Sequence, residues 1–194
     1  MKRKLLIISI LILVLITGCK SNANTSSDNR EYVVNKKISD NEKIEDVFQE
    51  LITSKIDKNF KIDDYIIQTA TSNYEDDSTE IYDLYFKIGE VRTNIGYTIF
   101  VENNKVTSIY NNLGNYNTES LKNKKDIINK KAAKLTDKEK EKIKEKVLSN
   151  YDNRTIDRDE IIYIVEEDTV YYMITYIDVD EGNALSMDSY FEKL

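Results

Sequence analysis

The stretch EIYDLYFKIGEVRTNIGYTIFV, residues 80 to 101, decides the fold because its apolar side chains recur at every second position. The Gly89-Glu90 pair divides it into two halves. This period of two predicts two strands, 80–88 and 93–101, joined as an antiparallel hairpin with one apolar face. That face consists of Tyr82, Leu84, Phe86, Ile88, Ile95, Tyr97, Ile99 and Val101.

Two further strand-like segments extend this hairpin into a meander. Residues 65–71 precede it and residues 105–111 follow it, with Asn103 and Asn104 at the turn before the last strand. Turn residues between alternating segments are typical of consecutive antiparallel strands. The sequence therefore predicts an antiparallel sheet whose apolar face needs a cover.

A helix before the meander provides that cover. Residues 40–55 carry apolar side chains at the i, i+3, i+4, i+7, i+8 spacing of one helical face. Ser39 and Glu42 match a capping box at its start, and residues 31–38 form a short strand before it. We therefore predict a first helix-plus-meander domain over residues 31–115, whose helix presents Ile44, Val47, Phe48, Leu51 and Ile52 to the sheet.

The second half of the chain repeats this order of elements. Thr136 and Glu139 form a capping box that opens another helix. Three strand-like segments follow it: 160–165, 169–179 and 184–190. We predict a second helix-plus-meander domain over residues 136–194, joined to the first by a basic helical linker, 116–135.

Short sequence matches between the halves favour a degenerate tandem repeat. IFVENNKVTSI, residues 99–109, aligns with IDVDEGNALSM, residues 177–187, with one gap at Gly182. At an offset of 95 positions, Glu50 and Ile67 fall on identical residues of the second half. The alternative is that two helix-plus-meander units share this much by chance. On the repeat interpretation the chain is of α+β class with two tandem units.

The final hairpin, YIDVDEGNALSMD at residues 176–188, has an acidic turn with Gly182 followed by a small apolar strand. It resembles the last hairpin of the PepSY family of exported bacterial domains. The first half departs from that pattern because Asn103 and Asn104 stand at its turn without a glycine. The resemblance implies a cystatin-like fold and a module that interacts with proteins or modulates a peptidase without catalysis of its own.

The N-terminus has the layout of a secretory signal. A basic start precedes an apolar run, Leu5 to Ile16, of twelve residues, which is shorter than the roughly 20 that a membrane-spanning helix needs. The tetrapeptide Ile16-Thr17-Gly18-Cys19 then resembles the lipobox of bacterial lipoproteins. The alternative is an ordinary signal peptide with a chance cysteine.

The lipobox resemblance implies cleavage between Gly18 and Cys19, so that residues 1–18 are a lipoprotein signal peptide. Cys19 would then carry a diacylglycerol with acyl chains such as palmitate, and two acyl chains suffice for stable anchoring. Residues 19–30 become a lipidated cysteine followed by a polar tether. We expect the protein on the extracytoplasmic face of the cell membrane of a Gram-positive bacterium.

The composition excludes several kinds of chemistry. The chain contains no histidine and one cysteine, and it lacks a G-x-S-x-G or S-x-x-K motif and a glycine-rich phosphate loop. Loss of residues 1–18 leaves 25 basic and 35 acidic side chains, a formal charge of −10, which argues against nucleic acid as a partner. We expect no catalytic residues, no cofactor and no metal site.

The acidic clusters are interpreted as turns. Residues 178–189 fail the calcium-loop pattern because Gly182, Asn183 and Ser189 stand at its fifth, sixth and twelfth positions. Weak calcium binding outside the cell remains an alternative for this cluster. The other two clusters, 75–77 and 166–168, are interpreted as solvated loop tips.

Two sets of residues are candidate binding surfaces. The first is a ligand face of strand tyrosines, for which ordinary strand packing is the alternative: Tyr163, Tyr171, Tyr172, Tyr176 and Tyr190. The second lies in residues 122–146, where eleven lysines face five acidic residues, and it would contact an anionic surface. Its members are Lys122, Lys124, Lys125, Lys130 and Lys131, and a solvated helix is the alternative.

The sequence thus predicts a membrane-anchored, non-enzymatic protein-interaction module that modulates a peptidase or another cell-envelope partner. The alternative is a receptor lipoprotein that binds a solute, peptide or glycan on its tyrosine-rich sheet. A carboxylate-based enzyme is the third hypothesis, and it would need two acidic side chains that converge in a pocket.

Replacement of the lipidation site tests the anchor. Cys19→Ser should abolish metabolic labelling with a fatty acid and leave an unprocessed precursor, because both steps need the thiol. Processing and release of the variant at the rate of the parent protein would contradict the lipobox assignment.

Overall fold

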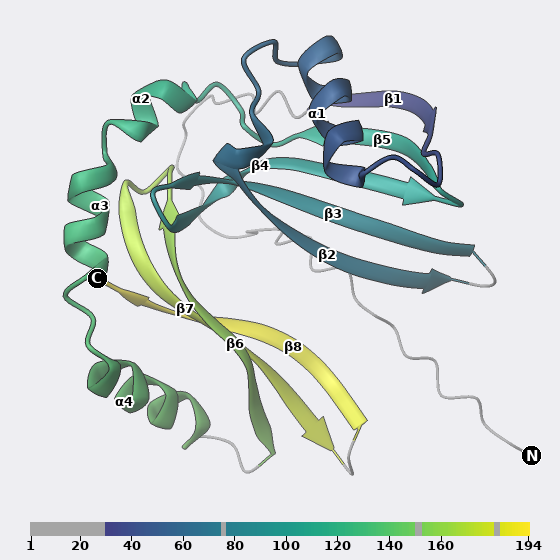
Figure 1. Ribbon diagram of the computed structural model, residues 1–194. Coiled ribbons are helices and arrows are strands. Elements are labelled where there is room, and N and C mark those ends of the chain that lie inside the picture. Colours follow the sequence, from purple (N-terminus) through teal and green to yellow (C-terminus); the bar gives the residue numbers. More distant parts are fainter. Residues whose placement is uncertain (1–29, 75–76, 150–152, 181–182) are drawn as a thin grey trace, which may run out of the picture.

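A computed structural model of the 194-residue chain describes residues 30–74, 77–149, 153–180 and 183–194 (Figure 1). These residues form a mixed α+β structure. In chain order its elements are β1 (Arg30–Lys37), α1 (Ile44–Lys55), the 3-10 turn η1 (Ile62–Asp64), β2 (Tyr65–Tyr74), β3 (Asp77–Ile88), β4 (Val91–Glu102), β5 (Lys105–Asn111), α2 (Thr118–Lys122), α3 (Lys125–Ala132), α4 (Asp137–Leu148), β6 (Arg154–Ile164), β7 (Thr169–Asp180) and β8 (Asn183–Lys193).

All eight described strands join in one sheet (Figure 1). Its order is β1-β5-β4-β6-β7-β8, with β3 on the other edge of β4 and β2 outside β3. Every pair is antiparallel except β4 and β6, which run parallel with Arg92 opposite Ile162 and Thr93 opposite Tyr163. One edge of β4 therefore pairs with β3, and the other is divided between β6 and β5.

The strands predicted from alternation are confirmed to within three residues at each end, except at the start of β6. The meander β2-β3-β4-β5 is antiparallel as expected, and the early strand is β1, which pairs with β5. β6 begins six residues before the predicted position, at Arg154. The ladder of β6 is irregular between Ile156 and Arg158. This bulge interrupts the alternation of apolar and polar side chains from which the strand was predicted.

The predicted start of the first helix is wrong. Ser39 and Glu42 do bond to each other, the Ser39 backbone N–H donating to Glu42 Oε2 over 2.8 Å. They close a separate turn, and α1 begins only at Ile44 after the extended residue Lys43. The predicted helical face is correct, since Val47, Phe48, Leu51 and Ile52 are buried. The second capping box is confirmed, with Thr136 as the N-cap of α4.

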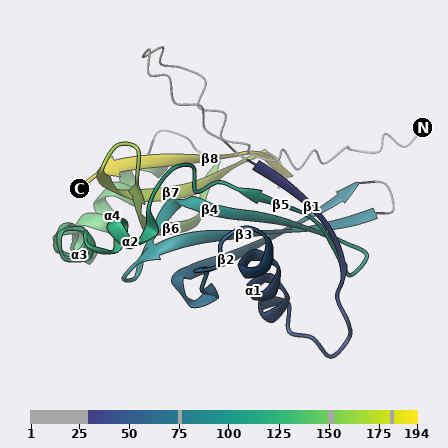
Figure 2. The ribbon, with the colours of Figure 1, turned by 90° about the horizontal axis from the view of Figure 1, so that it is seen from above.

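The helices cover one face of the sheet. Side chains opposite each other in a ladder point to the same side, so Thr93 and Tyr163 share a face, and both belong to the buried interior that contains α1. α4 packs on the same face further along, through Val147 against Tyr172 and Ile174. Figure 2 shows α1 and the group α2–α4 at different ends of this layer. The opposite face of the sheet carries none of the four described helices.

The strands of the two predicted units, 31–115 and 136–194, meet at the β4–β6 ladder. The main core crosses this ladder, because Tyr163 and Val170 pack in the same cluster as Phe48. The segment predicted as a basic linker, 116–135, contains α2 and α3. Leu121 of α2 and Ile128 of α3 are buried in the same core.

Gly96 sets the distance between β3 and β4. It lies opposite Tyr85, next to the β3 bulge, and a Cβ atom at this position would be 1.8 Å from the carbonyl oxygen of Leu84. No real Cβ approaches a backbone oxygen so closely, so any other residue would force these two central strands apart.

We expect Gly96→Ala to lower the free energy of unfolding by about 3 kcal/mol, the upper end for overpacking a close contact. Denaturant titration followed by circular dichroism measures this. Gly114→Ala is the matched control, because its Cβ would meet only ordinary contacts near 3.8 Å and its positive φ alone should cost about 1 kcal/mol. Equal losses for the two variants would contradict the close packing of β3 on β4.

Candidate functional site

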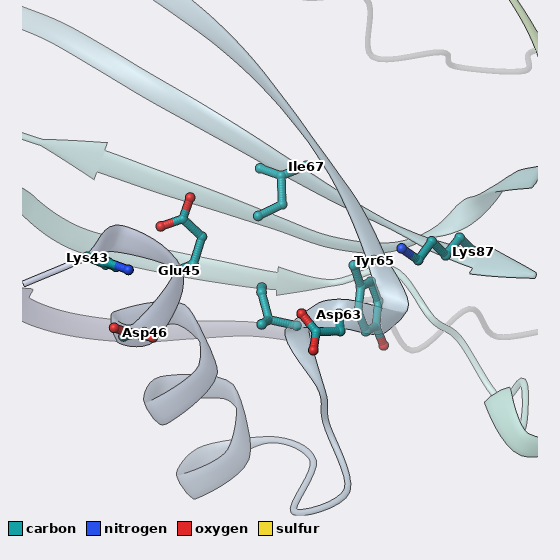
Figure 3. Close-up of a pocket in the computed structure, with 8 residues that line it drawn as sticks. Lys43, Glu45, Asp46, Asp63, Tyr65, Ile67 and Lys87 are labelled. Carbon is teal, nitrogen blue, oxygen red and sulfur yellow. The ribbon is translucent and has the colours of Figure 1, made fainter. Parts of the chain in front are cut away.

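A groove of about 800 Å³ lies between the first turn of α1 and the strand β2 (Figure 3). In the described sheet β2 pairs with β3 alone, so its outer edge presents backbone N–H and C=O groups that can pair with another chain. The residues that line the groove are Lys43, Glu45, Asp46, Ile62, Asp63, Tyr65, Ile67 and Lys87.

Gln49 fixes the two walls of the groove relative to each other. Its side-chain amide donates to the carbonyl oxygen of Phe60 over 2.8 Å and accepts from the backbone N–H of Ile62, also over 2.8 Å. Both ends of one amide thus tie α1 to the segment that leads into β2. The width of the groove is set by a polar clamp as well as by packing.

The floor of the groove is aromatic and aliphatic. Tyr65 is buried and packs against Phe60, with ring centroids 4.9 Å apart, and against Phe86, at 5.6 Å. Burial raises the pKa of Tyr65 well above its usual range, so its hydroxyl stays neutral. Ile67 is partly buried next to it, and together these side chains offer an apolar surface beside the strand edge.

The rim of the groove is mainly acidic. Glu45, Asp46 and Asp63 are exposed and stand against Lys43 and Lys87, a formal charge of −1. Figure 3 shows Glu45 and Asp63 beside Ile67 and Tyr65, with Asp46 further away on the first turn of α1. An acidic rim beside an open strand edge suits an extended polypeptide that carries a basic side chain.

Two of the five predicted ligand-face tyrosines are buried. Tyr163 is 1% exposed, and its hydroxyl donates to Asp168 and accepts from Lys124. Tyr172 is fully buried and donates to Asp159 over 2.7 Å. Burial raises the pKa of both hydroxyls. Neither ring can contribute to an exposed face.

The other three tyrosines do not share a site. Tyr176 lies 3.7 Å below the Arg154 guanidinium and Tyr190 accepts from Lys146 over 2.7 Å, both on the face covered by α4. Tyr171 faces the other side of β7, where it packs against Phe191 with ring centroids 6.1 Å apart. The structure therefore does not gather the five predicted tyrosines on one surface.

The five predicted surface lysines divide into two groups. Lys122 bonds Asp64 over 2.8 Å, and Lys124 bonds Asp168 over 2.8 Å, and these hydrogen bonds raise the pKa of both ammonium groups. They join α2 to η1 and the start of α3 to the β6–β7 turn. Lys125 and Lys130 are exposed and Lys131 is half-buried. In the described part of the chain, no ion pair links a lysine of this second group to a carboxylate.

The acidic cluster at residues 166–168 lies at the exposed turn between β6 and β7, as predicted, and each of its carboxylates also has a partner. Asn94 donates to Glu166 over 2.6 Å, Tyr171 donates to Glu167, and Lys124 bonds Asp168. The hydrogen bond from Lys124 lowers the pKa of Asp168. These contacts hold the β6–β7 turn against β4 and α3.

Asp178, in the acidic hairpin at the end of the chain, forms an ion pair. Arg154 donates a hydrogen bond to its carboxylate over 2.8 Å, which lowers the pKa of Asp178.

In the parts of the chain that the structure describes, no group of three or more histidine, cysteine or acidic residues is arranged to hold a metal ion. Gly18, Cys19 and residues 75–76 lie outside the described residues. Within those described ranges, no helix is long and apolar enough to cross a membrane.

The sequence did not reveal the groove or the ion pair between the buried Arg92 and the half-buried Glu160. Arg92 is 6% exposed, donates to both carboxylate oxygens of Glu160 over 2.8 and 2.9 Å, and lies 4.1 Å from the ring centroid of Tyr85. Each feature joins segments far apart in the chain, and no local pattern signals such pairing. For the tyrosines a signal existed, since neighbours such as Tyr171 and Tyr172 must point to opposite faces of a strand.

No protein-family model, curated protein or solved structure shows significant similarity to this chain.

Proposed function

We propose that this chain is a non-enzymatic interaction module, anchored by lipid at Cys19 to the outer face of a bacterial cell membrane. Its groove binds an extended polypeptide segment of an envelope partner, which adds a strand to the outer edge of β2. Backbone pairing with an open edge supplies affinity, and pockets beside the edge supply specificity.

The single observation that carries the proposal is the groove beside the edge of β2. Tyr65 and Ile67 give it an apolar floor, while Glu45, Asp46 and Asp63 give it an acidic rim. An extended segment with alternating apolar and basic residues would match both features. The proposed ligand is therefore a peptide strand with at least one lysine or arginine.

The arrangement of helices on strands supports the finer interpretation as two PepSY-like units. α1 packs on β3 and β4, through Phe48 against Tyr82 at a centroid distance of 5.1 Å, and α4 packs on β7 through Val147. On this interpretation the envelope partner is a peptidase or its substrate segment, and the groove of the first unit modulates it by holding an extended strand.

A receptor that uses the five tyrosines has less support. Tyr163 and Tyr172 are buried, and Tyr171 faces away from Tyr176 and Tyr190. An aromatic surface for a solute or glycan would need these rings exposed on one side. The groove is therefore the stronger candidate site.

Site-specific crosslinking on intact cells tests the proposed function. A photo-crosslinking amino acid that replaces Asp63, at the groove, should capture an envelope protein. The same amino acid in place of Glu50, which is exposed on α1 outside the groove, should capture nothing. Glu45→Lys should lower the yield at position 63 about tenfold, equivalent to ~1.4 kcal/mol of binding free energy.

The matched control for the charge change is Glu50→Lys, which makes the same reversal on the same helix and should leave the yield unchanged. Equal capture from positions 63 and 50 would refute a groove-specific partner. Hydrolase turnover by the purified protein that is lost when one groove carboxylate is replaced would refute the non-enzymatic assignment.

A further inference from the structure

We infer that the outer ridge of α3 rests on an anionic phospholipid bilayer. The ridge consists of Ile127, Lys130, Lys131 and Lys134. Ile127 enters the interface between the headgroups, and the three lysines pair with lipid phosphates. This inference rests on the membrane anchoring in the proposed function and goes beyond its peptide groove.

The geometry of α3 creates the ridge. Ile128 is buried and Ala132 packs against the core, so these residues mark the inner side of the helix. Successive residues turn by about 100°, which places Ile127 and Lys130 on the outer side. Lys134 continues the ridge past the last turn, where its N–H bonds the carbonyl oxygen of Lys131 over 3.1 Å. Ile127 is 64% exposed.

The charge on the ridge is balanced only in part by the protein, through the action of Lys131 at a distance on the carboxylate of Asp168. Residues 122–135 contain six lysines and one acidic residue, Asp126. Two of the six, Lys122 and Lys124, bond Asp64 and Asp168. Among the described residues no ion pair links the ridge lysines to a carboxylate. The ridge is thus a local positive surface on a strongly acidic chain.

The neighbouring helix α4 shows a different pattern. It is also rich in lysine, but Lys140 pairs with Asp137 at 3.7 Å and Lys144 pairs with Glu141 at 3.3 Å. Such i, i+3 pairs are typical of a solvated helix. The unbalanced charge is therefore specific to α3 and is not a general feature of the lysine-rich segment.

An exposed isoleucine among unpaired lysines favours a bilayer over a soluble polyanion. Peripheral membrane helices place large apolar side chains in the headgroup region and lysines beside anionic lipids. A soluble polyanion would bind the lysines electrostatically but would leave the Ile127 side chain exposed to water. The acyl chains on Cys19 would hold the ridge near the bilayer, so that weak contacts suffice.

The position of α3 agrees with this contact. Figure 1 places α3 and α1 in different parts of the molecule. A bilayer on the outer side of α3 would therefore leave α1 and its groove free to bind a partner in the envelope. None of the ridge residues lines the groove.

A single tryptophan tests the inference, because the chain contains none. Full-length lipidated protein with Ile127→Trp is reconstituted into vesicles of phosphatidylcholine alone or with added phosphatidylglycerol. We expect its emission to shift to shorter wavelength only with phosphatidylglycerol, and to return in 1 M salt, where the Debye length falls to about 3 Å. Val33→Trp, at a position 71% exposed on β1, should show no shift.

Charge variants in the Ile127→Trp background complete the test. Lys130→Glu, Lys131→Glu and Lys134→Glu together should abolish the shift. The matched control makes the same charge change at three exposed lysines near the end of α1, namely Lys55, Lys58 and Lys61, and should keep the shift.

Identical emission in both vesicle types would overturn the bilayer contact, as would a shift caused by soluble polyphosphate and not by phosphatidylglycerol. Flotation of the protein with both vesicle types reports the lipid anchor independently. Loss of flotation would therefore count against the anchor on which the inference rests, whereas flotation without the emission shift counts against the ridge alone.

Discussion

The structure depends on Arg92, a cation buried where β4 meets β6. Its guanidinium bonds both oxygens of Glu160 and lies over the ring of Tyr85. A buried charge without its partner is strongly destabilising, so β4 and β6 keep their positions only together. The side chain of Asn94 adds to this contact by accepting from the backbone N–H of Val165 over 3.0 Å. These bonds surround the parallel ladder of an otherwise antiparallel described sheet.

The ladder determines where the molecular surfaces lie. Because β6 occupies the start of the free edge of β4 and β5 occupies the rest, the pair β2–β3 extends from the other edge and leaves β2 open. Its parallel register also brings the second group of strands under the same layer of helices as the first. The proposed peptide groove lies between α1 and β2, whereas the proposed lipid-facing ridge belongs to α3, and both helices pack on one continuous sheet.

Much of the fold could be predicted because strands and helices each impose a short period on the positions of apolar residues. Alternation located the strands, and helical spacing located the buried face of α1. The site could not be predicted in the same way. Arg92 and Glu160 are 68 positions apart. Lysines of similar sequence context also differ in their contacts, since Lys122 bonds Asp64 of η1 whereas Lys130 is exposed. Only the three-dimensional structure shows which of these lysines lies next to a carboxylate from a distant part of the chain.

Arg92 couples the two halves of the sheet, and single-tryptophan variants measure this coupling directly. Tyr82→Trp reports the first half and Tyr190→Trp the second, since the chain has no other tryptophan. We expect coincident urea midpoints for the two probes, and Arg92→Leu should lower the free energy of unfolding by about 3 kcal/mol in each background. Separate midpoints, or a probe that does not respond to Arg92→Leu, would contradict this coupling.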